Sequence, residues 1–158
     1  MTTVLAAAKF RARSSSVGAS ASAGTEMNIK VAVRARPPEP AGSESMLEFD
    51  ADGNSVTETG AGGERSTFAF DYAFGGDATQ QEVYDGLGRP ILDYAFEGYN
   101  GTILAYGQTG SGKSHSVMGS ADDLGIIPRL SVELFERIEQ APPGVSFVVS
   151  ATYLELYN

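Results

Sequence analysis

The clearest alternation of apolar and polar positions lies in the segment IKVAVRARPP, which begins at Ile29. One face of this extended segment is apolar, whereas the other face ends in two arginines, Arg34 and Arg36. Pro37 and Pro38 cannot donate hydrogen bonds to a ladder, so we expect the strand to end there. The pattern therefore predicts a strand that delivers two guanidinium groups on one face of its end.

A Gly-, Ser- and Asp-rich region follows over residues 40–66. Two short apolar pieces, residues 46–49 and 67–70, indicate small edge strands. We expect these pieces to form a small peripheral β lobe rather than part of a central sheet.

A helix is predicted after Thr79, because Glu82 lies three residues later and completes a capping-box pattern. Apolar residues then recur at helical spacing up to Gly98. Three residues weaken the middle of this helix and predict a kink or a break near Arg89: Gly86, Gly88 and Pro90.

Three further segments complete the pattern. Residues 101–106 (GTILAY) are typical of a buried parallel strand, residues 128–140 have the apolar period of a helix, and residues 145–157 predict a long strand. Strands and helices in this order predict an α/β fold with a central, mostly parallel sheet flanked by helices. Ligands of such sheets bind at the carboxyl ends of the strands.

The first 26 residues lack any apolar period and are rich in Ser, Ala and Gly. Their Arg- and Ser-rich, acid-poor composition also describes organelle transit peptides, but a plain disordered extension is the simpler interpretation. We therefore expect a disordered leader, residues 1–26, followed by one domain, residues 27–158.

Composition excludes several classes of function. With no cysteine and a single histidine, a disulfide framework is impossible and a zinc centre is improbable, which suits a reducing, intracellular compartment. The net charge is −9, and the few basic residues of the leader leave the body still more acidic, so we expect no nucleic-acid partner. No apolar run approaches the ~18 residues of a membrane span, so we expect no membrane insertion.

The segment GQTGSGKS matches the P-loop pattern of Gly, four residues, then Gly-Lys-Ser. Glycines let successive N–H groups point at phosphate oxygens, and Lys113 supplies a charge that reaches the β- and γ-phosphates. The hydroxyl of Ser114 can complete the shell of a magnesium ion. A merely flexible Gly/Ser loop is the weaker alternative, because the pattern lies between an apolar strand and a helix start. The candidate phosphate site comprises Gly107, Gln108, Thr109, Gly110, Ser111, Gly112, Lys113 and Ser114.

A P-loop by itself neither selects a base nor hydrolyses ATP. Hydrolysis needs a second carboxylate for the magnesium shell and a residue that positions water. Asp71, Asp122 and Asp123 do not end an apolar strand beside the P-loop strand, so we interpret them as solvated loop charges. We therefore predict no catalytic residue within this chain.

The order and spacing of six segments resemble the opening of a kinesin motor domain: IKVAVRARPP, FAFDYAF, TQQEVY, EGYNGTILAYGQTGSGKSHSVMG, GIIPRL and YLELYN. The resemblance covers residues 29–158. It implies a P-loop NTPase fold, ATP and Mg²⁺ as cofactors, and ATP hydrolysis coupled to movement along microtubules of the cytoplasmic cytoskeleton. It also implies that the domain is incomplete, with both nucleotide-sensing switches and the microtubule-binding face after Asn158. We then expect this chain alone to be inactive and tubulin to be bound through the missing C-terminal half.

The resemblance also assigns the base end of the site. It implies that Arg34, Arg36 and Pro37 lie beside the adenine, and that His115 packs near the base. The alternative for the two arginines is that they are ordinary exposed cations of a strand. The alternative for His115 is that it is an exposed polar residue in the first turn of a helix. Serine at position 114, with the segments AFEGYN and GIIPRLSVELFERI, is similar to the organelle-transporting third class of kinesins.

Two other functions compete with a motor ATPase. A small-molecule or nucleotide kinase needs the same phosphate cradle, but such kinases usually carry the P-loop on their first strand, whereas a strand, a lobe and a helix precede it here. A non-hydrolysing binding module is the second alternative. The two switch motifs distinguish the motor from the binding module, since they either follow Asn158 or do not.

Overall fold

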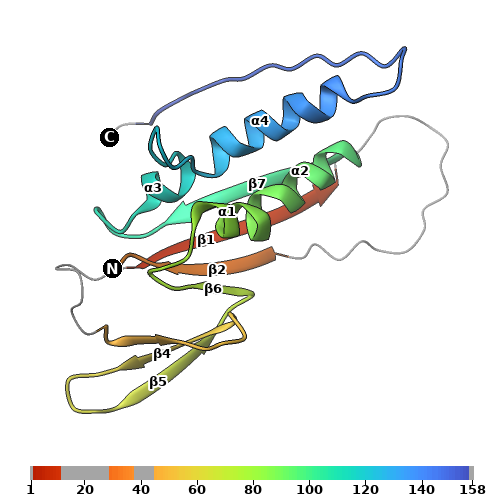
Figure 1. The fold of residues 1–158 in the computed structure, drawn as a ribbon. Coiled ribbons are helices and arrows are strands. Elements are labelled where there is room, and N and C mark those ends of the chain that lie inside the picture. The colour runs from red at the N-terminus through yellow and green to blue at the C-terminus, as the bar shows by residue number, and fades with distance from the viewer. Residues whose placement is uncertain (1, 12–28, 38–44, 157–158) are drawn as a thin grey trace.

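The computed structural model describes residues 2–11, 29–37 and 45–156. Its centre is a four-stranded sheet in the order β6-β2-β1-β7 (Figure 1). The strands are β1 Thr2–Arg11, β2 Ile29–Ala35, β6 Tyr72–Phe74 and β7 Tyr99–Tyr106. β2 is parallel to β6, and β1 is antiparallel to both β2 and β7, so β6, β2 and β7 run in one direction. The predicted α/β fold is confirmed, but its sheet is mixed rather than mostly parallel: among the described strands, β2 and β6 form a parallel pair, and both pairs of β1 are antiparallel.

The expectation of a disordered leader is wrong for residues 2–11. They form β1, which lies between β2 and β7 and pairs with both of them, from Thr2 opposite Ala35 to Arg11 opposite Tyr99. Two parallel strands present unpaired backbone groups along their facing edges, and an antiparallel segment between them satisfies both sets. Such pairing depends on tertiary context, so an alanine-rich segment without an apolar period gave no sign of it. Residues 12–26 of the predicted leader lie outside the described residues.

The predicted helix after Thr79 forms with an interruption in its middle. α1 spans Gln80–Val83 behind a complete capping box, a five-residue π-helical turn η1 spans Tyr84–Gly88, and α2 spans Arg89–Phe96. Both the cap and the irregularity before Arg89 are confirmed. The glycines of this stretch and Pro90 favour a local change of helix geometry over a regular α-helix.

The two faces of the central sheet are covered by different layers. On one face, Ala32 packs with Val83, Tyr84 and Leu87 of the interrupted helix and with Ile126 of α4 (Ile126–Glu139). On the other face, residues of β2 and β6 pack with a peripheral sheet in the cluster Val33, Val56 and Ala73. The second half of β2 is therefore buried on both faces.

The predicted peripheral lobe is confirmed as a three-stranded antiparallel sheet. Its strands are β3 Leu47–Phe49, β4 Ser55–Thr59 and β5 Arg65–Ala69. The sequence pattern predicted the first and the third of these strands but missed β4, whose alternation is short and lies between glycine-rich turns.

The last third of the chain confirms a helix and corrects two strand predictions. α4 matches the helix expected over residues 128–140. Residues 145–156 form no strand, because no strand of the described residues pairs with them. β7 is neither buried nor next to a parallel strand: it is an edge strand beside β1, with Leu104 59% and Tyr106 72% exposed. No helix in the described residues is long and apolar enough to span a membrane.

Candidate functional site

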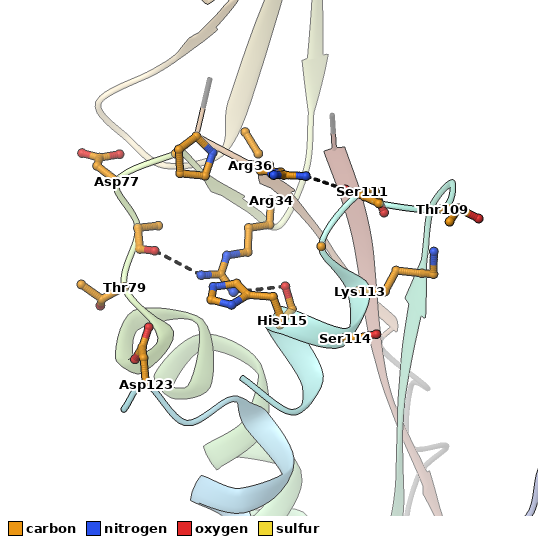
Figure 2. A pocket seen from close by; sticks show the side chains of 17 residues that line it. Arg34, Arg36, Asp77, Thr79, Thr109, Ser111, Lys113, Ser114, His115 and Asp123 are labelled. Atoms are coloured by element: carbon orange, nitrogen blue, oxygen red, sulfur yellow. Dashed lines mark hydrogen bonds between the residues drawn. The ribbon is translucent and has the colours of Figure 1, made fainter. Parts of the chain in front are cut away.

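An open pocket of about 890 Å³ lies where β2 and β7 end, at the carboxyl edge predicted for ligand binding (Figure 2). The end of β2, the loop before α1 and the P-loop with the start of α3 (Lys113–Val117) surround it. Most of the predicted site residues line this pocket: Arg34, Arg36, Pro37, Thr109, Gly110, Ser111, Gly112, Lys113, Ser114 and His115. Gly107 and Gln108 do not line the pocket.

The P-loop adopts backbone angles that its glycines make accessible. Gly110 has a φ of 80° and Gly112 has a φ of 104°, both in the left-handed region that favours glycine. Gly112 is also the residue that precedes α3, so the chain turns there from the loop into the helix. This curled backbone is the shape that a phosphate cradle requires.

Lys113 lies over the loop that precedes it. Its Nζ donates hydrogen bonds to the carbonyl oxygens of Gly107, at 2.7 Å, and Gln108, at 2.8 Å. These two residues therefore belong to the site through their backbone, although they do not line the pocket. The contacts hold a positive charge at the P-loop, where the charge of a phosphate chain would need compensation.

The end of β2 is joined to the P-loop by Arg36. This side chain is exposed, and its Nη1 donates to the carbonyl oxygen of Gly110 at 3.2 Å. Pro37 is also exposed at this end of the pocket. The structure therefore brings the predicted base end and the predicted phosphate end of the site into one cavity.

Arg34 has a different environment from Arg36. It is 8% exposed, and its guanidinium donates to Gln80 Oε1 at 2.7 Å, Ser116 Oγ at 3.1 Å and the carbonyl oxygen of Ala78 at 3.3 Å. Burial lowers the pKa of Arg34, and Asp123 opposes that shift. The alternative of an ordinary exposed strand cation is therefore wrong for Arg34, although a role beside the adenine stays a prediction.

His115 lies exposed in the first turn of α3 and lines the pocket. Its carbonyl oxygen accepts a hydrogen bond from Gln80 Nε2 at 2.6 Å, and its ring Nε2 lies 3.3 Å from the same nitrogen. The ring thus lies within hydrogen-bond distance of a buried side chain of α1. Its packing against a base stays a prediction.

The sequence did not reveal three contributors to this site: Gln80, Ser116 and Asp123. Gln80 follows the capping residue Thr79. A polar side chain on an otherwise apolar helix face was the one sequence feature that could have indicated its role. Asp123 was interpreted as a solvated loop charge, yet it lines the pocket and lies 3.4 Å from Arg129 while 52% exposed. Within the described residues, no group of three or more His, Asp or Glu side chains is arranged to hold a metal ion.

Asp71 also differs from a free loop charge. It accepts hydrogen bonds from Lys30 Nζ at 2.6 Å and from the backbone N–H of Val31 at 2.8 Å, and these bonds lower the pKa of its carboxyl. Asp71 therefore anchors the start of β2 far from the P-loop.

A strand, a glycine loop and a helix that together enclose a basic pocket define the P-loop class of nucleotide-binding proteins. The chain belongs to the kinesin family: the model of the kinesin motor domain matches residues 20–158. It is 41% identical over 120 residues to human centromere-associated protein E, covering 76% of this chain and 4% of that protein. It is 46% identical over 113 residues to mouse kinesin-like protein KIF13A, covering 66% of this chain and 6% of that protein.

The fold is also similar to that of a solved kinesin. The structure of KIF14 with ADP in complex with a microtubule matches with a TM-score of 0.60 and 33% identity, over 70% of this chain and 34% of that chain. Kinesin-like protein unc-104 of Caenorhabditis elegans is 41% identical over 126 residues, covering 73% of this chain and 8% of that protein. The chain thus spans about a third of the solved motor and a tenth or less of these three relatives.

Proposed function

We propose that this chain is the ATP-binding part of a kinesin-type microtubule motor ATPase. One observation carries the proposal: Lys113 and the curled P-loop share a single pocket with Arg36, Pro37 and His115. A nucleotide needs charge compensation at its phosphates and a separate surface for its base, and these two groups of residues supply them.

The residues of the pocket fit ATP and Mg²⁺. The P-loop backbone and Lys113 would hold the β- and γ-phosphates, and the exposed hydroxyl of Ser114 would enter the shell of the ion. Arg36, Pro37 and His115 would contact the adenine. Bound ATP supplies the phosphoanhydride bond whose cleavage drives a motor.

The coupling to microtubules rests on the relatives. The solved KIF14 structure is a complex with ADP and a microtubule, and this chain covers 34% of it. We propose that the parts of the motor domain not spanned by this chain supply the hydrolytic residues and the microtubule face, so that the chain alone is inactive. The working place would be the cytoplasmic microtubule cytoskeleton. Similarity to KIF13A and unc-104 supports the organelle-transporting third class.

Microtubule-stimulated ATPase activity of a version extended to a complete motor domain tests this function. Lys113→Ala removes the cation that the P-loop holds for the β- and γ-phosphates and should abolish stimulated turnover, because the phosphate charge is then not compensated at that end of the pocket. Lys30→Ala is the matched control, since Lys30 pairs with Asp71 at the start of β2. Normal turnover by Lys113→Ala would refute the assignment, and nucleotide binding without turnover in the wild-type extended form would favour a non-hydrolysing module.

A further inference from the structure

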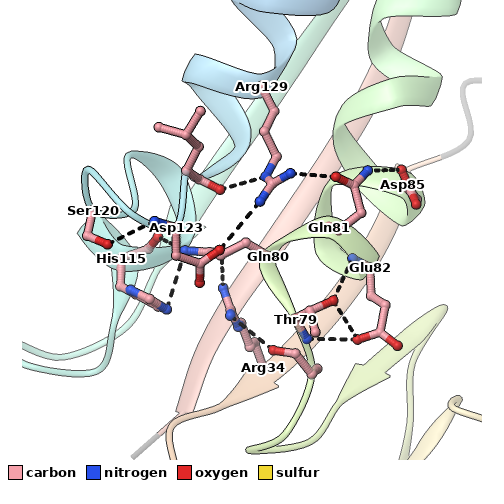
Figure 3. Close-up of polar contacts among 12 residues, drawn as sticks. Arg34, Thr79, Gln80, Gln81, Glu82, Asp85, His115, Ser120, Asp123 and Arg129 are labelled. Atoms are coloured by element: carbon pink, nitrogen blue, oxygen red, sulfur yellow. Dashed lines mark hydrogen bonds and ion pairs between the residues drawn. The ribbon is translucent and has the colours of Figure 1, made fainter.

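Gln80 occupies a buried position between the two ends of the pocket. It is 1% exposed, and its amide lies between Arg34 of β2 and His115 of α3 (Figure 3). The oxygen Oε1 is 2.7 Å from Arg34 Nη1. The nitrogen Nε2 is 2.6 Å from the carbonyl oxygen of His115 and 3.3 Å from its ring Nε2. One amide therefore connects the base-end strand to the helix that follows the P-loop.

The chemistry of the partners fixes the orientation of this amide. A guanidinium has only donors, so the group facing Arg34 has to be the amide oxygen. A carbonyl oxygen only accepts, so the group facing the backbone of His115 has to be the amide nitrogen. The two constraints agree, and exchanging the oxygen and nitrogen of Gln80 would break both hydrogen bonds.

The orientation of the amide determines the tautomer of His115. The amide nitrogen has two N–H groups and no acceptor, so the ring nitrogen beside it has to accept. In a neutral imidazole the proton then resides on the other nitrogen, Nδ1. An exposed histidine without such a partner would exchange between tautomers and side-chain rotamers.

We propose that Gln80 is a positioning residue of the pocket, which holds His115 as its Nδ1–H tautomer and ties the ring to the buried Arg34. His115 then presents one fixed donor to a ligand, which suits an acceptor atom on the edge of a base. The effect on ligand preference rests on the proposed nucleotide binding, whereas the assignment of the tautomer does not.

The single histidine of the chain makes the tautomer directly measurable. Histidine-selective ¹⁵N labelling gives one imidazole, and NMR distinguishes its protonated nitrogen from its unprotonated one. We expect Nδ1 protonated in the wild-type chain. In Gln80→Leu no N–H faces the ring, so the imidazole should exchange between its two tautomers and lose the clear preference for Nδ1–H. Gln81→Ala, on the exposed side of α1, should leave the wild-type pattern. A wild-type Nε2–H, or an unchanged Nδ1–H pattern in Gln80→Leu, would overturn the proposal.

Ligand affinity separates this role from a purely structural one. Gln80→Leu should weaken ADP about tenfold, the effect of losing a buried hydrogen-bond network, while tripolyphosphate affinity changes less than about twofold. Retained tripolyphosphate binding also shows that the variant folds. Equal loss for both ligands, or no loss for ADP, would overturn the proposed role. Failure of the wild-type protein to bind ADP would instead refute the nucleotide function and leave the tautomer result standing.

Discussion

The candidate pocket and the segment of residues 145–156 differ in how far their side chains are buried and hydrogen-bonded. In the pocket, part of the polar lining is buried and hydrogen-bonded, as Arg34 is with Gln80 and Ser116. Across the part of the chain that the structure describes, no buried side-chain nitrogen or oxygen lacks a hydrogen-bond partner. In the segment of residues 145–156, apolar groups face outward instead: Val148 is 97%, Tyr153 89% and Leu156 90% exposed.

This difference in burial shows that a sequence pattern forms its element only where neighbouring elements of the described chain contact it. Around the pocket, β2, α1 and α3 come from distant parts of the sequence but meet through specific contacts, so each element supports the others. The segment of residues 145–156 has the alternation of a strand, yet no strand of the described residues pairs with it, and only Phe147 lies against Phe96 in a ring contact. An alternating sequence pattern therefore forms a strand only where a second strand is present to pair with it.

The same leucine substitution should have very different effects in these two regions. Leu87 is 1% exposed in the helix that covers the sheet, and Leu154 is 71% exposed in the segment of residues 145–156. Leu87→Ala should lower the free energy of unfolding by about 2–5 kcal/mol, whereas Leu154→Ala should change it by less than about 0.5 kcal/mol. Urea denaturation followed by circular dichroism measures both values, and similar values would contradict the contrast.

Two glycines with positive φ form a matched pair whose expected difference is smaller than that between the two leucines. Gly119, in the loop that carries Asp123, has a φ of 72°, and a Cβ there would meet the carbonyl oxygen of Asp123 at 2.2 Å. Gly144 has a φ of 91° and nothing within 4 Å of such a Cβ. Gly144→Ala should cost only the backbone strain, about 1–2 kcal/mol, and Gly119→Ala should cost about 1–3 kcal/mol more because backbone has to move. Equal melting temperatures would show that this loop is not packed as described.

A pH effect smaller than these is expected at Glu133 of α4. Burial opposes its ionisation, but hydrogen bonds from Tyr84, Arg137 and Arg89 outweigh burial and lower the pKa of Glu133. A lowered folded-state pKa gives stability that is present above the unfolded pKa of about 4.5 and is lost as pH falls through the folded value.

Glu133→Gln should therefore lower the free energy of unfolding by about 1 kcal/mol at pH 7 and flatten its decline below pH ~4.5. Glu155→Gln, in the exposed segment, is the control and should leave both unchanged. A wild-type pH profile in Glu133→Gln would show that these hydrogen bonds contribute nothing to stability.

Elements with local signals could be predicted from the sequence. The P-loop has a fixed spacing of residues, the capping box before α1 is a four-residue pattern, and α4 has a strong apolar period. β1 could not be predicted, because its hydrogen bonds come from two strands that lie later in the chain. The error over residues 145–156 has the same origin, since a strand pattern without a strand beside it cannot form a ladder.

Within the site, the sequence identified side chains that a ligand would meet but not those that support them. Lys113, Arg36 and His115 follow from motif positions and all lie at the pocket. Gln80 and Ser116 support the pocket through hydrogen bonds with Arg34. They lie 46 and 82 positions after Arg34 in the sequence, and no spacing rule predicts such contacts.

The central claim is that one pocket has a phosphate end at Lys113 and a base end at Arg36, and paired titrations of ATP and tripolyphosphate test it most directly. Lys113→Ala should abolish detectable binding of both ligands. Arg36→Ala should weaken ATP by about 1–3 kcal/mol, by analogy with stacking on a base, and leave tripolyphosphate nearly unchanged. If Arg36→Ala weakened both ligands equally, or if Lys113→Ala bound both as the wild type does, the assignment of the two ends would be contradicted.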